Sequence, residues 1–317
     1  MKHSGAPLGL MLAATAASFW LPLILPACVM GKVLREDNGP LSRRLNLPVY
    51  EWRDNDSSPR AIVVAIHGYI QHGLTFDAVA RELASRGFHV VALDQRGSGR
   101  WLTGDGFPQS DKTDCRQSEE DLVALLRTLK ADYPSLPVIG MGESLGACFI
   151  IHVAVREPQL MRGAILASPA IRATRKLYVK GTFEALLSLL RPGRRVNISS
   201  YFEKYTGSDQ RVIDEKLSDP VVRKAVMVSE VLDVNRWNRG TLKLARRMPP
   251  GLPVLIMQAT SDPLLREKYI RKLIWILDSQ DETIRRFEQE GHIFLQTRFF
   301  RPDAVAAVSE WLRSHTP

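Results

Sequence analysis

Cysteine is scarce in this chain of 317 residues, which contains Cys28, Cys115 and Cys148 and no other. Their spacing does not fit a zinc site, and three cysteines are too few for a disulfide scaffold. Cys115 and Cys148 could pair in an oxidising compartment. Because Cys148 lies in an apolar run, a buried free thiol is the simpler expectation. The sequence therefore predicts neither a metal site nor a fold that depends on disulfides.

The chain also lacks an internal repeat, coiled-coil periodicity and a nucleic-acid-binding motif, which argues against a solenoid and against a partner of DNA or RNA. The formal net charge is +9, but the basic residues are scattered and are not interleaved with aromatic residues. A solvated basic face is the expected role of such charges, and an anionic membrane surface is the alternative. The clearest basic cluster comprises Arg172, Arg175, Lys176, Lys180, Arg191, Arg194 and Arg195.

Residues 1–30 favour a targeting segment that is not part of the fold. Lys2 and His3 open the segment, no further charge follows until Lys32, and apolar runs lie between them. This order is typical of a secretory signal peptide or a membrane anchor. The Leu-Pro-Ala-Cys run that ends at Cys28 is similar to the lipobox of bacterial lipoproteins, in which this cysteine is lipidated after cleavage. An uncleaved anchor is the alternative, because about 20 apolar residues span a bilayer. Both predict an exported protein held on the outer side of the cytoplasmic membrane.

Apolar runs of strand length alternate with helical patterns along most of the remaining chain, whose composition is that of an ordinary globular protein. Strands are expected at 45–52, 61–66, 88–93, 136–141, 164–167, 254–258 and 283–288. Helices are expected at 74–85, 118–133, 145–155 and 266–277, and from about 302 onward. In the second of these helices, Ser118 and Asp121 form a capping pattern. The alternation predicts an α/β fold, with a mainly parallel sheet covered by helices on both faces.

This alternation is interrupted at residues 169–250, which contain helical stretches such as 182–190 and 221–234 but no convincing core strand. An interruption of this length is too long for a loop and predicts an inserted helical cap. Residues 31–44 are polar and basic and favour a linker. The predicted organisation is therefore a linker at 31–44, a core at 45–168 and 251–317, and a cap at 169–250.

The sequence Gly142-Glu143-Ser144-Leu145-Gly146 follows a predicted strand and opens a predicted helix. This context is the one in which a G-x-S-x-G motif forms a nucleophile elbow, a tight turn that exposes the serine at the end of the sheet. The two glycines flank the serine where the backbones crowd, and the helix N-terminus favours negative charge. Ser144 is therefore the candidate nucleophile.

A serine hydroxyl needs a base to become nucleophilic, and in this arrangement the chain order is serine, acid, histidine. Of the seven histidines, His292 lies in the loop after the last predicted strand, where the base belongs. Asp262 directly follows the preceding core strand and is the candidate acid that orients the imidazole and stabilises the imidazolium. The interval of thirty residues between Asp262 and His292 has room for one helix and one strand.

An oxyanion formed at the acyl carbon must be stabilised by backbone N–H groups. One donor is expected from Leu145, directly after the nucleophile, and the other from the loop after the first core strand. This loop is His67-Gly68-Tyr69, and we assign the second donor to the backbone N–H of Tyr69. His67 is expected to pack so that it shapes the loop, and not to act as a base.

Three motifs together resemble the monoacylglycerol lipase and lysophospholipase branch of the α/β-hydrolases: His67-Gly68-Tyr69, Leu-Asp-Gln-Arg-Gly-Ser-Gly over 93–99, and the motif around Ser144. The segment Leu-Ser-Asp-Pro-Val-Val-Arg over 217–223 is similar to part of the cap of that branch. The resemblance runs from about residue 45 to the C-terminus. It implies an eight-stranded sheet, a helical lid, no cofactor and an ester of a single acyl chain as substrate. Asp94 and Arg96 are then structural turn residues.

Three hypotheses about the activity follow. The first is hydrolysis of a carboxylic ester through an acyl-enzyme on Ser144. The second is acyl transfer or amide hydrolysis on the same triad. The sequence does not separate these reactions from ester hydrolysis, because the shape of the pocket selects the acceptor. The third is a membrane-anchored binding protein on an inactive hydrolase fold, against which the complete order of Ser144, Asp262 and His292 argues. Epoxide and haloalkane hydrolysis are disfavoured, since those reactions use an aspartate at the elbow.

Overall fold

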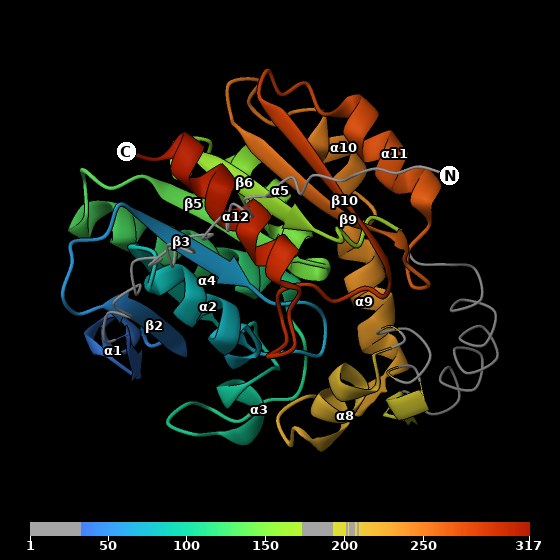
Figure 1. The fold of residues 1–317 in the computed structure, drawn as a ribbon. Helices are drawn as coiled ribbons and strands as arrows, with labels where there is room; N and C mark the ends of the chain where they lie inside the picture. Colours follow the sequence, from blue (N-terminus) through green and yellow to red (C-terminus); the bar gives the residue numbers. More distant parts are fainter. Residues whose placement is uncertain (1–32, 173–192, 201, 203–206, 208) are drawn as a thin grey trace, which may run out of the picture. The chain divides into compact units, whose positions relative to one another are not determined.

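The computed structural model describes residues 33–172, 193–200, 202, 207 and 209–317 (Figure 1). Their main feature is an eight-stranded sheet with the strand order β1-β2-β4-β3-β5-β6-β9-β10. The strands of this sheet are β1 (Val33–Asp37), β2 (Val49–Asp54), β3 (Ala61–Ile66), β4 (Phe88–Leu93), β5 (Val138–Glu143), β6 (Gly163–Ala167), β9 (Val254–Ser261) and β10 (Glu282–Glu290). β2 is antiparallel to both of its neighbours, and the other neighbouring pairs are parallel. The predicted α/β fold with a mainly parallel, eight-stranded sheet is confirmed.

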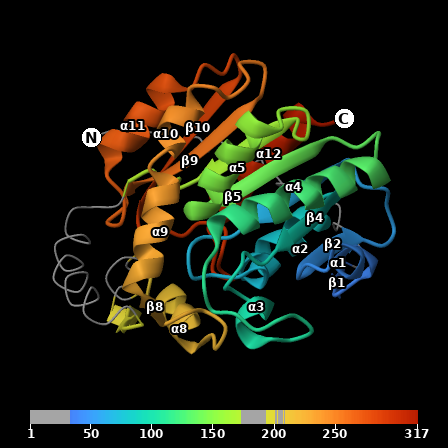
Figure 2. The same ribbon diagram turned by 180° about the vertical axis from the view of Figure 1, so that it is seen from behind.

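Helices cover both faces of this sheet, as predicted. The helices of the core are α1 (Pro40–Leu45), η1 (Gly73–Phe76), α2 (Asp77–Ala84), α3 (Arg100–Thr103), α4 (Cys115–Asp132), α5 (Leu145–Arg156), α11 (Glu267–Ile276) and α12 (Pro302–His315). α2 and α12 pack on the face seen in Figure 1, and α4, α5 and α11 pack on the face seen in Figure 2. Because both faces are covered, β3 and β4 are buried along their whole length, which explains their continuous apolar runs.

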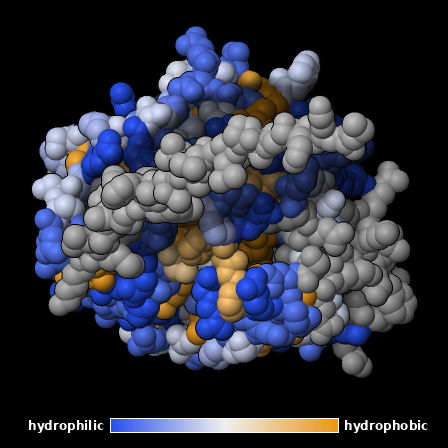
Figure 3. Space-filling model, in the orientation of Figure 1, coloured by the Kyte–Doolittle hydropathy of each residue, from blue (hydrophilic) through white to orange (hydrophobic). Residues whose placement is uncertain are grey.

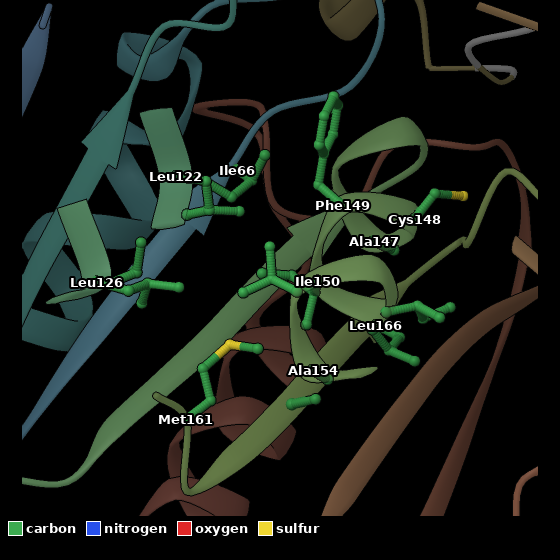
Figure 4. Packing of buried hydrophobic residues seen from close by; sticks show 14 of the residues in the cluster. Ile66, Leu122, Leu126, Ala147, Cys148, Phe149, Ile150, Ala154, Met161 and Leu166 are labelled. Carbon is green, nitrogen blue, oxygen red and sulfur yellow. The ribbon is translucent and has the colours of Figure 1, made fainter. Parts of the chain in front are cut away.

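The helix behind the predicted nucleophile, α5, is buried on nearly all sides. Figure 4 shows Ile150 of this helix packed close to Met161 and the central strands. The contact requires a glycine on β5: a β-carbon added at Gly140 would lie 2.5 Å from Met161 Sδ and 2.9 Å from Ile150 Cδ1. Tight packing of this kind holds the start of α5, and therefore the elbow, in one position.

Residues 31–44 were predicted to form a linker, and for the described residues 33–44 this prediction is wrong. Val33–Asp37 form β1, which pairs with β2 in the register Val33↔Asp54, and Pro40–Leu45 form α1. Pro40 stands in the first turn of α1, and Asn46 ends the helix in the left-handed region with φ 52°. β1 lies at the edge of the sheet and is partly exposed, so its residues lack the apolar run by which buried strands are recognised.

The insertion between β6 and β9 contains β7 (Arg195–Asn197), α8 (Gln210–Ser218), β8 (Ala225–Met227), α9 (Val228–Asn238) and α10 (Thr241–Ala245). β7 and β8 form a small antiparallel sheet of their own. The helix predicted at 221–234 begins only at Val228, because Asp219 accepts hydrogen bonds from the backbone of Val221 and Val222 and turns the chain there. The helix predicted at 182–190 lies outside the described residues, as does most of the basic cluster.

The beginning of α4 also differs from the prediction. The helix starts at Cys115, and its N-cap is Asp114, whose carboxylate accepts hydrogen bonds from the backbone N–H groups of Arg116 and Gln117. Aspartate caps a helix as well as serine does, so the sequence did not separate the two positions. Ser118 lies one turn inside the helix and accepts a hydrogen bond from the backbone of Arg96 at 2.9 Å.

The surface is mixed in character. In the view of Figure 3, hydrophobic atoms gather near the centre, and most of the remaining described surface is hydrophilic. Large exposed hydrophobic side chains among the described residues include Leu232, Trp275 and Ile284. Within the same residues, no helix has the length and apolar character that crossing a bilayer requires. The predicted targeting segment at 1–30, with Cys28, lies outside the described part of the chain.

Candidate active site

The candidate nucleophile stands at a sharp turn between β5 and α5. Ser144 has φ 58° and ψ −118°, a backbone conformation that non-glycine residues rarely adopt and that costs about 1–3 kcal/mol. The turn is possible because its flanks are glycines. A β-carbon at Gly142 would lie 2.4 Å from the backbone of Gly146, and one at Gly146 would lie 1.9 Å from Ile66 O. The motif thus forms the strand–turn–helix that the nucleophile elbow requires.

The three residues proposed from chain order lie together at the carboxyl end of the sheet. The Ser144 hydroxyl is 2.7 Å from His292 Nε2, and Asp262 Oδ2 is 2.7 Å from His292 Nδ1. The other carboxylate oxygen of Asp262 accepts hydrogen bonds from the backbone of Leu264 at 2.8 Å and of Leu265 at 3.0 Å. Asp262 is thus held by its own loop and holds the imidazole with a proton on Nδ1, which leaves Nε2 free to accept the serine proton.

The electrostatics of the histidine suit a base. His292 is buried, and burial disfavours its charged form. The charge of Asp262, the hydrogen bond that the imidazole donates to Asp262 and the charge of Glu143 together outweigh burial, so the pKa of His292 is raised above its ordinary value of 6.5. A more basic imidazole accepts a proton from serine more readily, and the two carboxylates stabilise the imidazolium that results.

The proposed oxyanion donors lie beside the nucleophile. A β-carbon added at Gly68 would be 3.2 Å from Ser144 Cβ, so the loop after β3 passes directly over the elbow. Among the described residues, the backbone N–H groups of Tyr69 and Leu145 have no hydrogen-bond acceptor. Both are therefore available to an oxyanion next to Ser144, which is consistent with the assignment made from the sequence.

His67 shapes this loop, as expected, and is not a base. Its Nε2 accepts a hydrogen bond from the backbone of Gln95 at 2.9 Å, and its Nδ1 donates to Gly68 O at 2.8 Å. Burial lowers the pKa of His67 to about 3, so the ring stays neutral and keeps these two roles at neutral pH. Asp94, predicted to be structural, accepts hydrogen bonds from Tyr50, Gly73 and Arg100.

One residue of the site was missed by sequence reasoning: Glu143, directly before the nucleophile. It is fully buried and accepts hydrogen bonds from three successive backbone N–H groups of the loop that carries His292, at Phe294 (2.5 Å), Leu295 (3.1 Å) and Gln296 (3.0 Å). Burial raises the pKa of Glu143 above its ordinary value, although these hydrogen bonds oppose the rise. The sequence signal that could have identified Glu143 is an acidic residue at the end of an otherwise apolar buried strand.

The cap contacts the catalytic loops through residues that were also missed. Arg223 and Glu230 form a buried ion pair, with Nη2 and Oε2 2.7 Å apart. Glu230 accepts a hydrogen bond from the Tyr69 hydroxyl at 3.1 Å, and the Arg223 backbone N–H donates to Ile70 O at 3.1 Å. The cap therefore supports the loop that carries the proposed oxyanion donor. The histidine loop is supported by the cap as well, because the buried Lys216 on α8 donates a hydrogen bond to Gln296 O.

The cysteines of the core are free thiols. Cys115 and Cys148 are both buried and unpaired, as the simpler of the two expectations had it. Burial raises the pKa of each thiol to about 12. Both are therefore protonated and unreactive in the folded protein.

A strained serine at an elbow, hydrogen-bonded to a histidine that an aspartate orients, on an eight-stranded sheet of this topology, defines a serine hydrolase with the α/β-hydrolase fold. The family described as serine aminopeptidase, S33, matches residues 57–297. The chain belongs to this family.

Known proteins of similar sequence and structure agree with this class. A monoacylglycerol lipase of Mycolicibacterium smegmatis is 25% identical over 276 residues, which cover 84% of this chain and 93% of the relative. The human monoglyceride lipase is 26% identical over 251 residues, which cover 76% of this chain and 78% of the relative. The crystal structure of a monoacylglycerol lipase from Paleococcus ferrophilus matches with a TM-score of 0.69 at 21% identity, over 85% of this chain and 99% of that one.

Proposed function

We propose that the protein hydrolyses carboxylic esters of single-chain lipids, of the monoacylglycerol or lysophospholipid type. The observation that carries the proposal is the continuous chain of two 2.7 Å hydrogen bonds from Ser144 through His292 to Asp262. The names of the relatives, which are lipases of monoacylglycerols, support the substrate class. A carboxylic ester is a more reactive acyl donor than an amide, because an alkoxide is a better leaving group than an amine.

The reaction proceeds through an acyl-enzyme. Ser144 Oγ attacks the ester carbonyl while its proton passes to His292 Nε2, and the carbonyl oxygen becomes an oxyanion between the N–H groups of Tyr69 and Leu145. The C–O bond to the alcohol then breaks, and His292 gives its proton to the departing alkoxide. Water repeats the sequence on the acyl-enzyme, with His292 again as base, and releases the fatty acid and free Ser144.

Amide hydrolysis is a second candidate for the same triad, because the matching family is described as a serine aminopeptidase. The two activities share every step up to the leaving group. An amine leaves only after His292 protonates it, whereas an alkoxide is a better leaving group. Turnover of matched esters and amides therefore separates the two candidates.

The experiment is labelling of the detergent-solubilised full chain with a fluorophosphonate probe, beside its Ser144→Ala variant. We expect the wild type to be labelled and the variant to be unlabelled but folded, followed by turnover of monoacylglycerols and lysophospholipids above that of aminoacyl amides. A folded wild type that stays unlabelled would refute the proposal and favour an inactive binding protein. Faster turnover of the amides would instead establish the second candidate.

We further propose that residues 1–30 export the protein and hold it on the outer face of the cytoplasmic membrane, as a lipoprotein acylated at Cys28. The support is the basic start, the apolar run and the Leu-Pro-Ala-Cys sequence. Mass spectrometry of the protein from membranes tests it: an N-terminus at a diacylated Cys28 is expected, and Cys28→Ser should abolish it. An intact Met1 in the membrane fraction would instead identify an uncleaved anchor.

A further inference from the structure

Gln296, four residues beyond the histidine, uses all of its polar groups within the site. Its side-chain Nε2 and its backbone N–H donate to Glu143 Oε2 at 2.8 Å and 3.0 Å. Its side-chain Oε1 accepts a hydrogen bond from the backbone N–H of Gly68 at 2.9 Å, and its backbone oxygen accepts one from Lys216. The residue is 1% exposed. It therefore joins the elbow, the histidine loop, the oxyanion loop and the cap at one point.

The orientation of this carboxamide is determined by its partners. Both oxygens of Glu143 accept hydrogen bonds from backbone N–H groups of the histidine loop, so the carboxyl acts as an acceptor here and the NH₂ group of Gln296 faces it. The oxygen then faces Gly68, whose N–H can only donate. Thr75 Oγ1 also lies on the oxygen side, at 3.4 Å. A flipped carboxamide would place oxygen against oxygen and N–H against N–H, at a cost of about 1–3 kcal/mol for each buried group left unpaired.

These contacts determine where the Tyr69 N–H points. The peptide bond is planar, so the N–H of Tyr69 points opposite to the C=O of Gly68. That carbonyl is held by His67 Nδ1 at 2.8 Å and by the backbone N–H of Gln71 at 3.2 Å. Gln296 holds the preceding peptide plane through the Gly68 N–H. With both planes held, the free N–H of Tyr69 has a fixed direction.

We propose that Gln296 is a positioning residue for the acyl transfer: through Glu143 it ties the oxyanion loop to the nucleophile elbow, and so fixes the distance between the Tyr69 N–H and Ser144. The inference rests on the hydrolytic function proposed above. The oxyanion donor and the nucleophile belong to different loops, and the Gly68–Gln296–Glu143 chain is a direct polar connection between them. Glu143 is the covalent neighbour of Ser144, so a shift of the oxyanion loop is opposed at the elbow itself.

The first test is Gln296→Met, which keeps the length of the side chain and removes both hydrogen bonds. Deleting an oxyanion donor typically costs about 10²–10³ in kcat. A donor that is displaced but not deleted should cost less, so we expect kcat for a p-nitrophenyl ester to fall by about 10- to 100-fold with KM nearly unchanged. The control is Val308→Ala, which removes two buried methyl groups from α12, outside the site. It should lower the melting temperature and leave kcat unchanged.

The second test is Gln296→Glu, for which we expect a dependence of kcat on pH that the wild type lacks. While protonated, the introduced carboxyl can donate to Glu143 and accept from Gly68, as the carboxamide does. When ionised, it faces a second buried carboxylate, and burial with a like charge raises its pKa into the working range. We expect kcat of Gln296→Glu to fall as pH rises across a range in which the wild type is constant, and to recover when pH is lowered.

These outcomes separate the inference from the proposed function. A wild type that fluorophosphonate does not label overturns both. If the wild type is labelled, two results would overturn the positioning role alone. One is a Gln296→Met variant that retains wild-type kcat, and the other is a Gln296→Glu variant that has the pH profile of the wild type. A merely structural role would lower the melting temperature of Gln296→Met, as for Val308→Ala, without changing kcat per folded molecule.

Discussion

Gly146→Ala should destabilise the protein, although alanine is the better helix former. Gly146 lies in the first turn of α5, where alanine would be favoured by up to about 1 kcal/mol on intrinsic propensity. The added β-carbon, however, would lie 1.9 Å from Ile66 O and 2.8 Å from His67 O. Relief requires the helix or β3 to move by roughly 1 Å, and close-packed interiors resist such shifts.

The magnitude follows from the atoms involved. Ile66 ends β3, which is hydrogen-bonded to β4 on one side and β5 on the other, so its carbonyl cannot swing away as a side chain would. Overpacking of a core costs about 1–3 kcal/mol and occasionally more, and a backbone clash belongs at the upper end. After the gain in propensity, we expect a net loss of about 2 kcal/mol or more, equivalent to a melting temperature lower by about 3 °C or more for a chain of 317 residues.

Because His67 begins the oxyanion loop, the same substitution should also slow fluorophosphonate labelling. Differential scanning fluorimetry and labelling rates measure the two effects. Gly251→Ala is the matched control: its β-carbon meets nothing within 4 Å, and its stability and labelling should equal those of the wild type. A Gly146→Ala protein that melts higher than the wild type would show that propensity outweighs the clash, and the steric account of the elbow would be wrong.

Three further predictions follow from the contacts described. With neutral His292 as the proposed base and its pKa raised, kcat/KM should rise with pH through a value above 6.5 and then level off. In Asp262→Asn this rise should move to lower pH while kcat falls by about 10⁴, as in the serine-protease triad; an unmoved profile would contradict the role of Asp262. Arg223→Met leaves the charge of Glu230 buried and should cost about 3–5 kcal/mol in urea unfolding, and adding Glu230→Gln should recover part of it; equal losses in the single and double variants would refute the pairing. The thiol of Cys148 should resist a thiol reagent in the native protein and react in urea, as followed by peptide mass spectrometry, and rapid native labelling would contradict its burial.

The chemistry of the site could be predicted from local signals. The elbow is encoded by five consecutive residues around Ser144, and the fold places Asp262 and His292 after the last two strands, so chain order identifies them. The core strands were recognised for a similar reason, because a strand buried on both faces, such as β3, is a continuous apolar run. Such signals need no knowledge of what each side chain contacts.

The supporting contacts could not be predicted in this way, because their partners are distant in sequence. Glu143 and Gln296 are separated by 153 positions, and Tyr69 and Glu230 by 161. Nothing in the residue types alone pairs a buried glutamate with three particular backbone N–H groups. The edge strand β1 was missed for a related reason, since its pairing with β2, and not its own composition, makes it a strand.

The sequence by itself therefore determined the class of fold and singled out Ser144, Asp262 and His292, which the structure brings into one hydrogen-bonded chain, because motif, strand pattern and chain order are local properties. Only the tertiary structure decided how these residues are held. Burial of Glu143 and Gln296 against each other, and of Arg223 against Glu230, arises only when strands and cap come together and exclude water. In that environment a hydrogen bond left unmade is costly, and this cost confines the catalytic loops to one geometry.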